Sequence, residues 1–119
     1  MVEVTFYRDS DERLSSVFAR GHAEFAVQSE DVVCAAVSAI LQALRLGLET
    51  YAGIPLDANQ EPGELHLRWP ENAREDAALR AIVTTAELSV ERIAAQYPEY
   101  VRFAREYDRR ATPRPPAWY

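Results

Sequence analysis

Cysteine and histidine are scarce in this chain of 119 residues, which contains one Cys and two His. A single cysteine allows no intramolecular disulfide, which is consistent with a reducing compartment. The two side chains best suited to holding a metal ion, His22 and Cys34, fall short of the three or four ligands that a zinc site uses. We therefore expect no metal and no cofactor.

Lysine is absent, since all thirteen basic residues are arginine, and nineteen acidic residues bring the formal charge to −6. This negative charge argues against a nucleic-acid-binding surface. It suits a basic partner, because electrostatic fields of opposite sign speed the encounter of two proteins. Charge alone does not identify that partner.

Long apolar runs are missing as well. No run approaches the roughly 20 residues that a membrane span requires, and the N-terminus opens directly into a strand pattern rather than a signal peptide. We therefore expect a cytoplasmic protein with no membrane partner. The length suits one domain, over residues 1–110, and three prolines within residues 111–119 predict a flexible C-terminal tail.

The spacing of apolar residues predicts an α+β fold. Alternation of apolar and polar side chains predicts four strands, at residues 2–7, 14–20, 54–58 and 64–69. Apolar residues three and four positions apart predict two main helices, at residues 32–51 and 73–97, with a short helical piece at 99–107. The order ββαββα indicates a four-stranded, mainly antiparallel sheet with the two main helices packed on it.

The connection between the second strand and the first helix carries the two side chains that thiol chemistry needs. Cys34 supplies a nucleophile, and His22 supplies a base that can take its proton. If Asp31 or Ser29 caps the helix, Cys34 lies near the free N–H groups and the positive end of the helix dipole, which favours the thiolate. Ser38 lies four residues after Cys34 on the same helical face, and its hydroxyl could hydrogen-bond to the thiolate or to a substrate carbonyl.

Each of these residues also has a purely structural interpretation. Cysteine is among the residues most often buried, so Cys34 could simply belong to the core. Asp31 could cap the helix or orient His22, and Ser38 could be a small packing residue. The second histidine, His66, is expected to face solvent on its strand.

The order of residues around the cysteine is more specific than the pairing of Cys with His. The sequence Gly-His-Ala, followed by Asp-Val-Val-Cys-Ala-Ala-Val-Ser with eleven residues between the histidine and the cysteine, resembles the ribosomal-processing cysteine protease family, Prp. The residues that carry the resemblance are Gly21, His22, Ala23, Asp31, Val33, Cys34, Ala35, Ala36, Val37 and Ser38. The resemblance implies a Cys–His dyad with Cys34 as nucleophile and His22 as base. Gly21, Asp31 and Ser38 then occupy supporting positions.

The resemblance also implies a substrate and an assembly. Enzymes of this family remove an N-terminal extension from large-subunit ribosomal protein twenty-seven, and they are expected to be homodimers without a metal. Here Ser29 replaces a glycine that often precedes the Glu-Asp pair, so the connecting loop is expected to be less free in conformation. We expect this loop, residues 23–30, to close over the peptide, with Phe25 and Val27 as its apolar anchors.

Two other classes of function remain open. A non-catalytic module that binds the ribosome would use the same acidic surface without needing the thiol. A thiol redox sensor would use Cys34, although the chain has no second cysteine to resolve an oxidised form. A cysteine endopeptidase is the hypothesis that accounts for the largest number of these residues.

Overall fold

The computed structural model describes residues 1–21 and 28–108, with residues 28–31 described by their backbone only. The sequence predictions that fall outside this part of the chain concern His22, Phe25, Val27, the side chains of Ser29 and Asp31, and the tail at residues 111–119.

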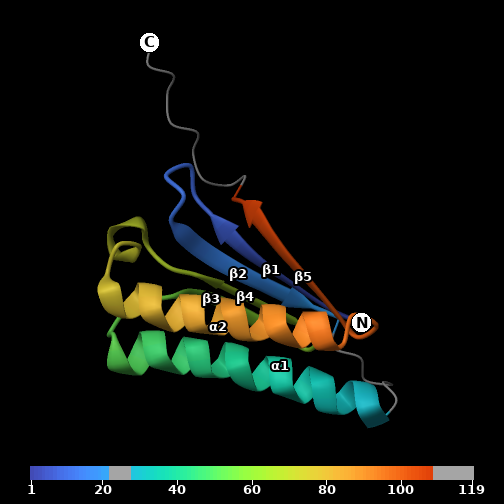
Figure 1. The fold of residues 1–119 in the computed structure, drawn as a ribbon. Coiled ribbons are helices and arrows are strands. Elements are labelled where there is room, and N and C mark those ends of the chain that lie inside the picture. Colours follow the sequence, from blue (N-terminus) through green and yellow to red (C-terminus); the bar gives the residue numbers. More distant parts are fainter. Residues whose placement is uncertain (22–27, 109–119) are drawn as a thin grey trace.

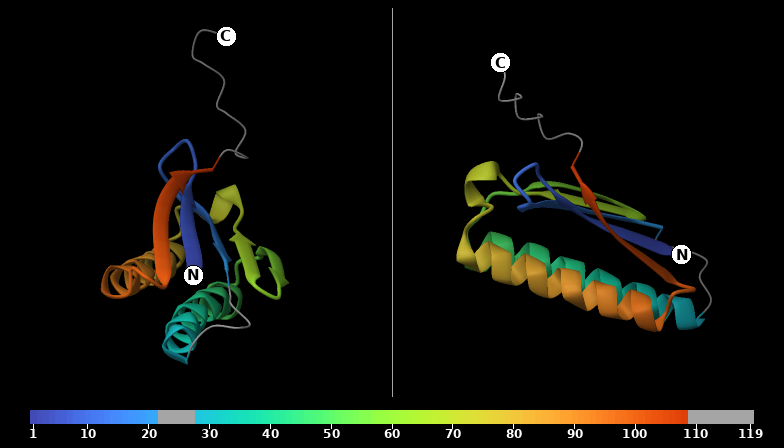
Figure 2. Two further views of the ribbon diagram at one scale, coloured as in Figure 1. Left: turned by 90° about the vertical axis from the view of Figure 1, so that its right-hand side faces the viewer. Right: turned by 45° about the horizontal axis from the view of Figure 1, so that its top comes forward.

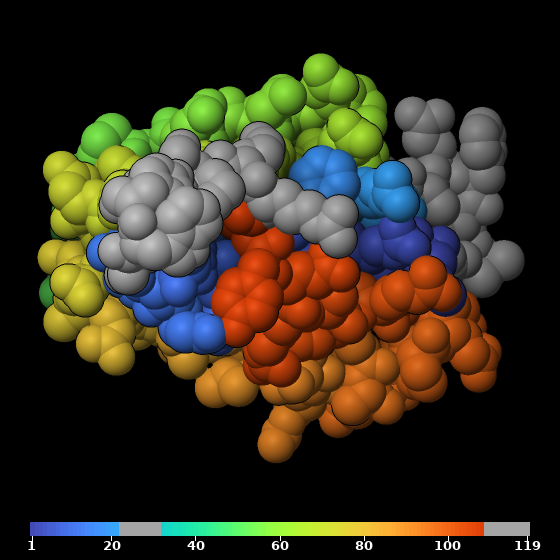
Figure 3. Space-filling view, turned by 90° about the horizontal axis from the view of Figure 1, so that it is seen from above, coloured from blue at the N-terminus to red at the C-terminus, as the bar shows by residue number. Residues whose placement is uncertain are grey.

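A five-stranded sheet forms one layer of the molecule (Figure 1). Its strands are β1 (Val2–Arg8), β2 (Leu14–Arg20), β3 (Asp57–Glu61), β4 (Glu64–Arg68) and β5 (Val101–Tyr107). They lie in the order β3-β4-β2-β1-β5. Neighbouring strands are antiparallel except β1 and β5, which run parallel. Figure 3 shows the sheet side of the surface, where β5 lies beside β1 and the β3–β4 hairpin lies toward the opposite edge.

Two long helices pack side by side on one face of the sheet (Figures 1 and 2). The first, α1 (Gln28–Leu46), continues into a π-helical turn over Gly47–Tyr51. The second, α2 (Ala77–Gln96), follows a 3-10 turn over Glu71–Ala73. The core lies between helices and sheet, and its largest fully buried side chains are Trp69, Phe6, Leu44, Leu48, Leu67 and Leu79. The prediction of an α+β fold with two main helices is therefore confirmed.

The fifth strand corrects the predicted topology. The segment expected to be a short helical piece is β5, and it makes the sheet mixed rather than four-stranded and mainly antiparallel. Its register pairs Val101 with Val2 and Phe103 with Val4. Val101 is buried and Phe103 packs against the core. The charged residues of the same segment do not by themselves favour a strand over a helix. Pairing with a strand distant in the sequence decided the conformation.

Three element boundaries also differ from the prediction. The first helix begins at Gln28, before Ser29 and Asp31, so neither residue is its N-cap. The second helix begins at Ala77, with the Asp76 carboxylate accepting the Leu79 N–H at 3.1 Å. The third strand begins only at Asp57. Ile54, which the prediction placed at the start of this strand, is instead buried in the core outside any strand. Its N–H donates to the Leu48 carbonyl at 2.9 Å.

One segment of the described residues is long and apolar enough to cross a membrane by length and composition alone. It spans Val32–Tyr51 and has a mean hydropathy of 1.6, which corrects the prediction that no such run exists. The core helix of a folded domain passes the same test, and Val37, Leu41, Leu44 and Leu48 of this segment belong to the core. The run is therefore weak support for a membrane span.

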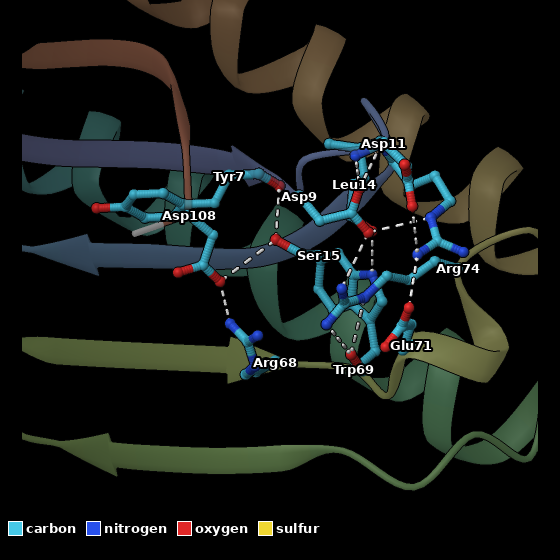
Figure 4. A network of polar contacts seen from close by, with 11 residues as sticks. Tyr7, Asp9, Asp11, Leu14, Ser15, Arg68, Trp69, Glu71, Arg74 and Asp108 are labelled. Carbon is cyan, nitrogen blue, oxygen red and sulfur yellow. Dashed lines mark hydrogen bonds and ion pairs between the residues drawn. The ribbon is translucent and has the colours of Figure 1, made fainter. Parts of the chain in front are cut away.

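A network of buried charged and polar groups lies at the β1–β2 turn, at one end of the sheet (Figure 4). Asp9 accepts the N–H groups of Asp11 at 2.8 Å and Arg13 at 3.1 Å, and the Arg74 guanidinium at 3.0 Å. Arg74 also donates to the Trp69 carbonyl at 3.2 Å, while the Trp69 indole N–H donates to the Leu14 carbonyl at 2.7 Å. These bonds tie the turn to the segment that leads into α2.

Candidate active site at Cys34

Cys34 lies on the face of α1 that meets the sheet, and the residue is only 4% exposed. It is the seventh residue of a helix that begins at Gln28, so it lies in the second turn rather than at the helix start. Only the first four N–H groups of a helix lack partners within it, and the dipole effect fades beyond the first turn. The prediction that free helix-start amides act on this sulfur is therefore wrong. The apolar periodicity that located the helix did not mark its first residue.

An open pocket of about 270 Å³ lies against Cys34. One wall is α1, and the other is the turn of the β3–β4 hairpin, with the start of β1 and the end of β2 between them. The lining residues are Val2, Ala19, Arg20, Cys34, Val37, Ser38, Leu41, Gln42 and the hairpin residues Gln60, Glu61, Pro62, Gly63, Glu64 and Leu65. The exposed Ser38 lines the same pocket as Cys34, so the predicted shared face is confirmed.

Side-chain hydrogen bonds hold the two walls of the pocket together. Gln60 on β3 accepts at its Oε1 from Gln42 Nε2 at 3.3 Å and from Arg45 Nη1 at 3.2 Å. Arg45 also donates to Glu49 at 3.1 Å, one turn further along the helix. These bonds link the hairpin to α1 and stabilise the width of the pocket.

Gly21 fixes the place where the chain leaves β2 for the predicted base. Its φ of +96° is in the left-handed region, and a Cβ there would lie 2.1 Å from the Met1 carbonyl oxygen. Its N–H donates to the Gly63 carbonyl at 3.1 Å, so the end of β2 is bonded to the hairpin turn. Only glycine fits this position without strain. His22 follows directly and lies outside the described residues, so the geometry of the dyad stays a prediction.

The second histidine lies on the other face of the sheet. Leu65 and Leu67 of β4 point into the core, so the intervening His66 points away from the helices. Its ring packs edge-on against Phe18, with 5.7 Å between ring centroids, and the residue is half-buried. This refines the prediction of a solvent-facing histidine and separates His66 from the thiol.

The charges around the pocket are partly paired. Arg20 donates to Glu3 at 2.9 Å, and Arg102 donates to the other oxygen of the same carboxylate at 3.1 Å. The Arg20 hydrogen bond, aided by both positive charges and opposed by partial burial, holds the pKa of Glu3 below its ordinary value. Within the described residues, no group of three or more His, Cys, Asp or Glu side chains could hold a metal ion.

Sequence reasoning missed the hairpin wall of the site. The Pro62-Gly63 turn was visible in the sequence, but its place beside Cys34 depends on β4 pairing with β2, which brings Glu64 opposite Arg20. That pairing joins segments more than forty residues apart along the chain. A pattern confined to one segment carries no information about it.

Known proteins are similar to this chain in sequence and in fold. A family model described as cysteine protease Prp matches residues 1–102. The ribosomal processing cysteine protease Prp of Bacillus subtilis is 28% identical over 106 residues, which cover 86% of this chain and 95% of that protein.

Solved structures agree in their architecture. The SMU.848 protein of Streptococcus mutans has a TM-score of 0.79 and 26% identity, covering 91% of this chain and 96% of its own. A ribosomal processing protease Prp from S. aureus, in complex with a covalently linked product peptide, has a TM-score of 0.77 and 23% identity, covering 88% and 99%. The family model spans most of the sequence, and this protein accordingly belongs to the cysteine protease Prp family.

Proposed function

We propose that this cysteine protease removes the N-terminal extension from the precursor of large-subunit ribosomal protein twenty-seven, with Cys34 as nucleophile and His22 as base. The observation that carries the proposal is the position of Cys34 at the wall of an open pocket, beside the end of the strand after which His22 follows. A peptide lying in this pocket would bring its scissile carbonyl to the sulfur.

The chemistry runs through an acyl-enzyme. His22 takes the Cys34 proton, or the pair rests as imidazolium and thiolate, and the sulfur attacks the scissile carbonyl carbon. The C–N bond breaks as His22 protonates the departing amine, and a water activated by His22 then cleaves the thioester. The Cys34 N–H lies inside the helix, so the Ser38 hydroxyl in the same pocket is the better candidate donor to the carbonyl oxygen. Asp31 would orient His22.

Two facts favour His22 over His66 as the base. The chain has two histidines, and His66 faces away from the helices against Phe18. Gly21 directly precedes His22 in the sequence, and its backbone is bonded to the pocket's hairpin wall. The predicted loop at residues 23–30 is too long, because Gln28, Ser29 and Glu30 belong to α1. The shorter connection before α1, with Phe25 and Val27, would cover the bound peptide.

The proposed substrate and compartment rest on relatives and on charge. The Bacillus subtilis relative is named a ribosomal processing protease, and an S. aureus relative has been solved with a substrate peptide. A chain with a formal charge of −6 is electrostatically suited to a basic ribosomal protein. The cytoplasm, where ribosomes are assembled, is the matching location.

An exposed apolar face on α1 supports the proposal of a homodimer. Val32 is 67% exposed and Leu46 is 64% exposed. Between them the exposed Ala36, Ala39 and Ala43 continue the same face at four- and three-residue spacing. The side chains of this face are large at both ends and small in the middle. Two copies packed antiparallel across Ala39 would therefore set Val32 of one against Leu46 of the other.

The two histidines make a matched pair of variants that tests the proposed function. We expect His22→Ala to slow precursor cleavage by at least a hundredfold, because general acid–base catalysis contributes about 10²–10⁴. We expect His66→Ala to keep near-wild-type cleavage, since its ring lies on the other face of the sheet. Intact-mass analysis of the precursor over time measures both rates. Equal rates for wild type and His22→Ala would contradict the dyad.

A further inference from the structure

The pocket beside Cys34 differs in character between its base and its rim. Buried apolar residues of four elements form the base around the sulfur, namely Val2, Ala19, Val37, Leu41 and Leu65. The rim is polar and is formed mainly by the exposed residues at the tip of the β3–β4 hairpin. A peptide entering the pocket would place one side chain against the base and its neighbours against the rim.

The rim carries two exposed carboxylates, Glu61 and Glu64. Glu61 and Glu64 are register partners on either side of the Pro62-Gly63 turn. Among the described residues, neither has an ion pair or a side-chain hydrogen bond, whereas the nearby Arg20 is already bonded to Glu3. Like charges directly opposite each other destabilise a sheet. The hairpin thus presents a negative charge pair at the mouth of the pocket, and a positive side chain placed there would relieve the repulsion.

The backbone that carries this pair is held from two sides. The Gly63 carbonyl accepts the Gly21 N–H at 3.1 Å, and Gln60 is bonded to Gln42 and Arg45 of α1. The hairpin that carries both carboxylates is therefore linked to the end of β2 through its backbone and to α1 through the Gln60 side chain. Charge held on a braced backbone can select between substrates with less ordering cost than charge on a loose loop.

We propose that Glu61 and Glu64 determine substrate specificity by binding a lysine or arginine side chain of the peptide, close to the residue that contacts Cys34. This inference rests on the proposed function, because it assumes that a peptide occupies the pocket. The pair would act as a charge-selective element, and the base around the sulfur would hold the neighbouring residue of the peptide.

The test uses peptides spanning the cleavage site, in which each basic residue is replaced by glutamine in turn. One peptide position, called the critical position, should be the one whose side chain binds Glu61 and Glu64. For wild-type protein, kcat/KM should be about three- to tenfold higher for the peptide with a basic residue there than for its glutamine counterpart, the range expected for two exposed ion pairs. The double variant Glu61→Gln/Glu64→Gln should lower this preference below about twofold. The matched control, Glu75→Gln/Glu106→Gln, removes two exposed carboxylates outside the pocket lining and should keep the preference.

Charge reversal and binding separate this inference from the proposed function. Glu61→Arg/Glu64→Arg should prefer a peptide with glutamate at the critical position, and added salt should weaken every preference. The same peptide pairs are also titrated against Cys34→Ala, with and without the two glutamine substitutions, so that binding is read without cleavage. The inference would be overturned if proteins with Glu61 and Glu64 and proteins with both glutamine substitutions showed the same preference for the basic peptide, in cleavage or in binding. If wild-type protein cleaved none of the peptides but the preference for binding the basic peptide still depended on Glu61 and Glu64, only the proposed function would be overturned.

Discussion

At Gly21 the backbone conformation and the space around one residue together exclude a side chain. The left-handed φ of +96° would cost an L-residue about 1–2 kcal/mol. A Cβ would also lie 2.1 Å from the Met1 carbonyl oxygen, a contact that forces the backbone to move. The residue lies one position before the proposed base, so its displacement would reach the site.

We expect Gly21→Ala to lower the free energy of unfolding by more than 2 kcal/mol, since strain and clash add, and to reduce cleavage at least tenfold. Gly53→Ala is the matched control, because Gly53 also has a positive φ of 64° but nothing lies within 4 Å of its added Cβ. It should cost only about 1 kcal/mol. Urea unfolding of both variants measures the difference, and equal destabilisation would show that the clash is relieved without cost.

Single residues were also the level at which the sequence predicted the site best. Cys34 and Ser38 line one pocket as their spacing indicated, and Gly21 has the positive φ that explains a glycine at the end of a strand. The start of α1 was missed because Gln28, Ser29, Glu30 and Asp31 have no apolar periodicity. Two acidic residues in the first turn nevertheless favour a helix through its dipole.

Among the elements, the β1–β2 turn depends on a single buried carboxylate. Asp9 is 3% exposed and bonds to two backbone N–H groups and to the side chains of Arg13 and Arg74. Burial opposes ionisation, but the hydrogen bonds from Arg13 and Arg74 outweigh it and hold the pKa of Asp9 below its ordinary value of 3.8. A carboxyl whose pKa is lower in the folded than in the unfolded state stabilises the fold when it is ionised.

We expect Asp9→Asn to lower the free energy of unfolding by about 2–4 kcal/mol at neutral pH, because it leaves the buried Arg74 without its counter-charge. The loss should be full above the unfolded pKa near 3.8 and should shrink as the pH falls through the lower folded pKa. Asp11→Asn changes a more exposed carboxylate of the same turn and should cost less than about 1 kcal/mol. Urea titrations between neutral pH and pH 3 would check this, and a pH-independent difference would contradict the assignment.

Element boundaries show why local patterns predict some elements and not others. The apolar residues at three- and four-residue spacing that predicted the first helix include Val33, Val37, Leu41 and Leu44, and all four are buried, because helical periodicity is local. In contrast, β5 exists because it pairs with β1, and β3 exists because it pairs with β4. Its burial is slight, so β3 has little apolar alternation to reveal it.

The assembly of the whole molecule follows from what the fold leaves uncovered. Much of α1 is apolar on both faces, and the sheet and α2 cover only one of them. The exposed face from Val32 to Leu46 is the surface that we expect a second copy to cover. Oligomeric state cannot be read from residue patterns alone, because the same apolar helix is compatible with burial inside a larger domain.

We expect wild-type protein to be a dimer and Ala39→Arg to be a monomer, because a large charged side chain at the centre of the helix pair would be buried without a partner. The matched control Ala95→Arg places the same side chain on an exposed position of α2 and should remain dimeric. Sedimentation equilibrium over a range of protein concentrations measures the mass. A dimeric Ala39→Arg variant would move the interface away from α1.

We interpret the whole fold as a scaffold that presents one thiol, that of Cys34, to a peptide. The most direct measurement is the intact mass of purified ribosomal protein precursor after incubation with wild-type protein or with Cys34→Ala. Alanine suits a helix interior, so the variant should stay folded, which its circular dichroism and unfolding curve would check. We predict that wild-type protein converts the precursor to the mature mass and that Cys34→Ala leaves it uncut. Cleavage by Cys34→Ala at the wild-type rate, at the same site, would contradict it.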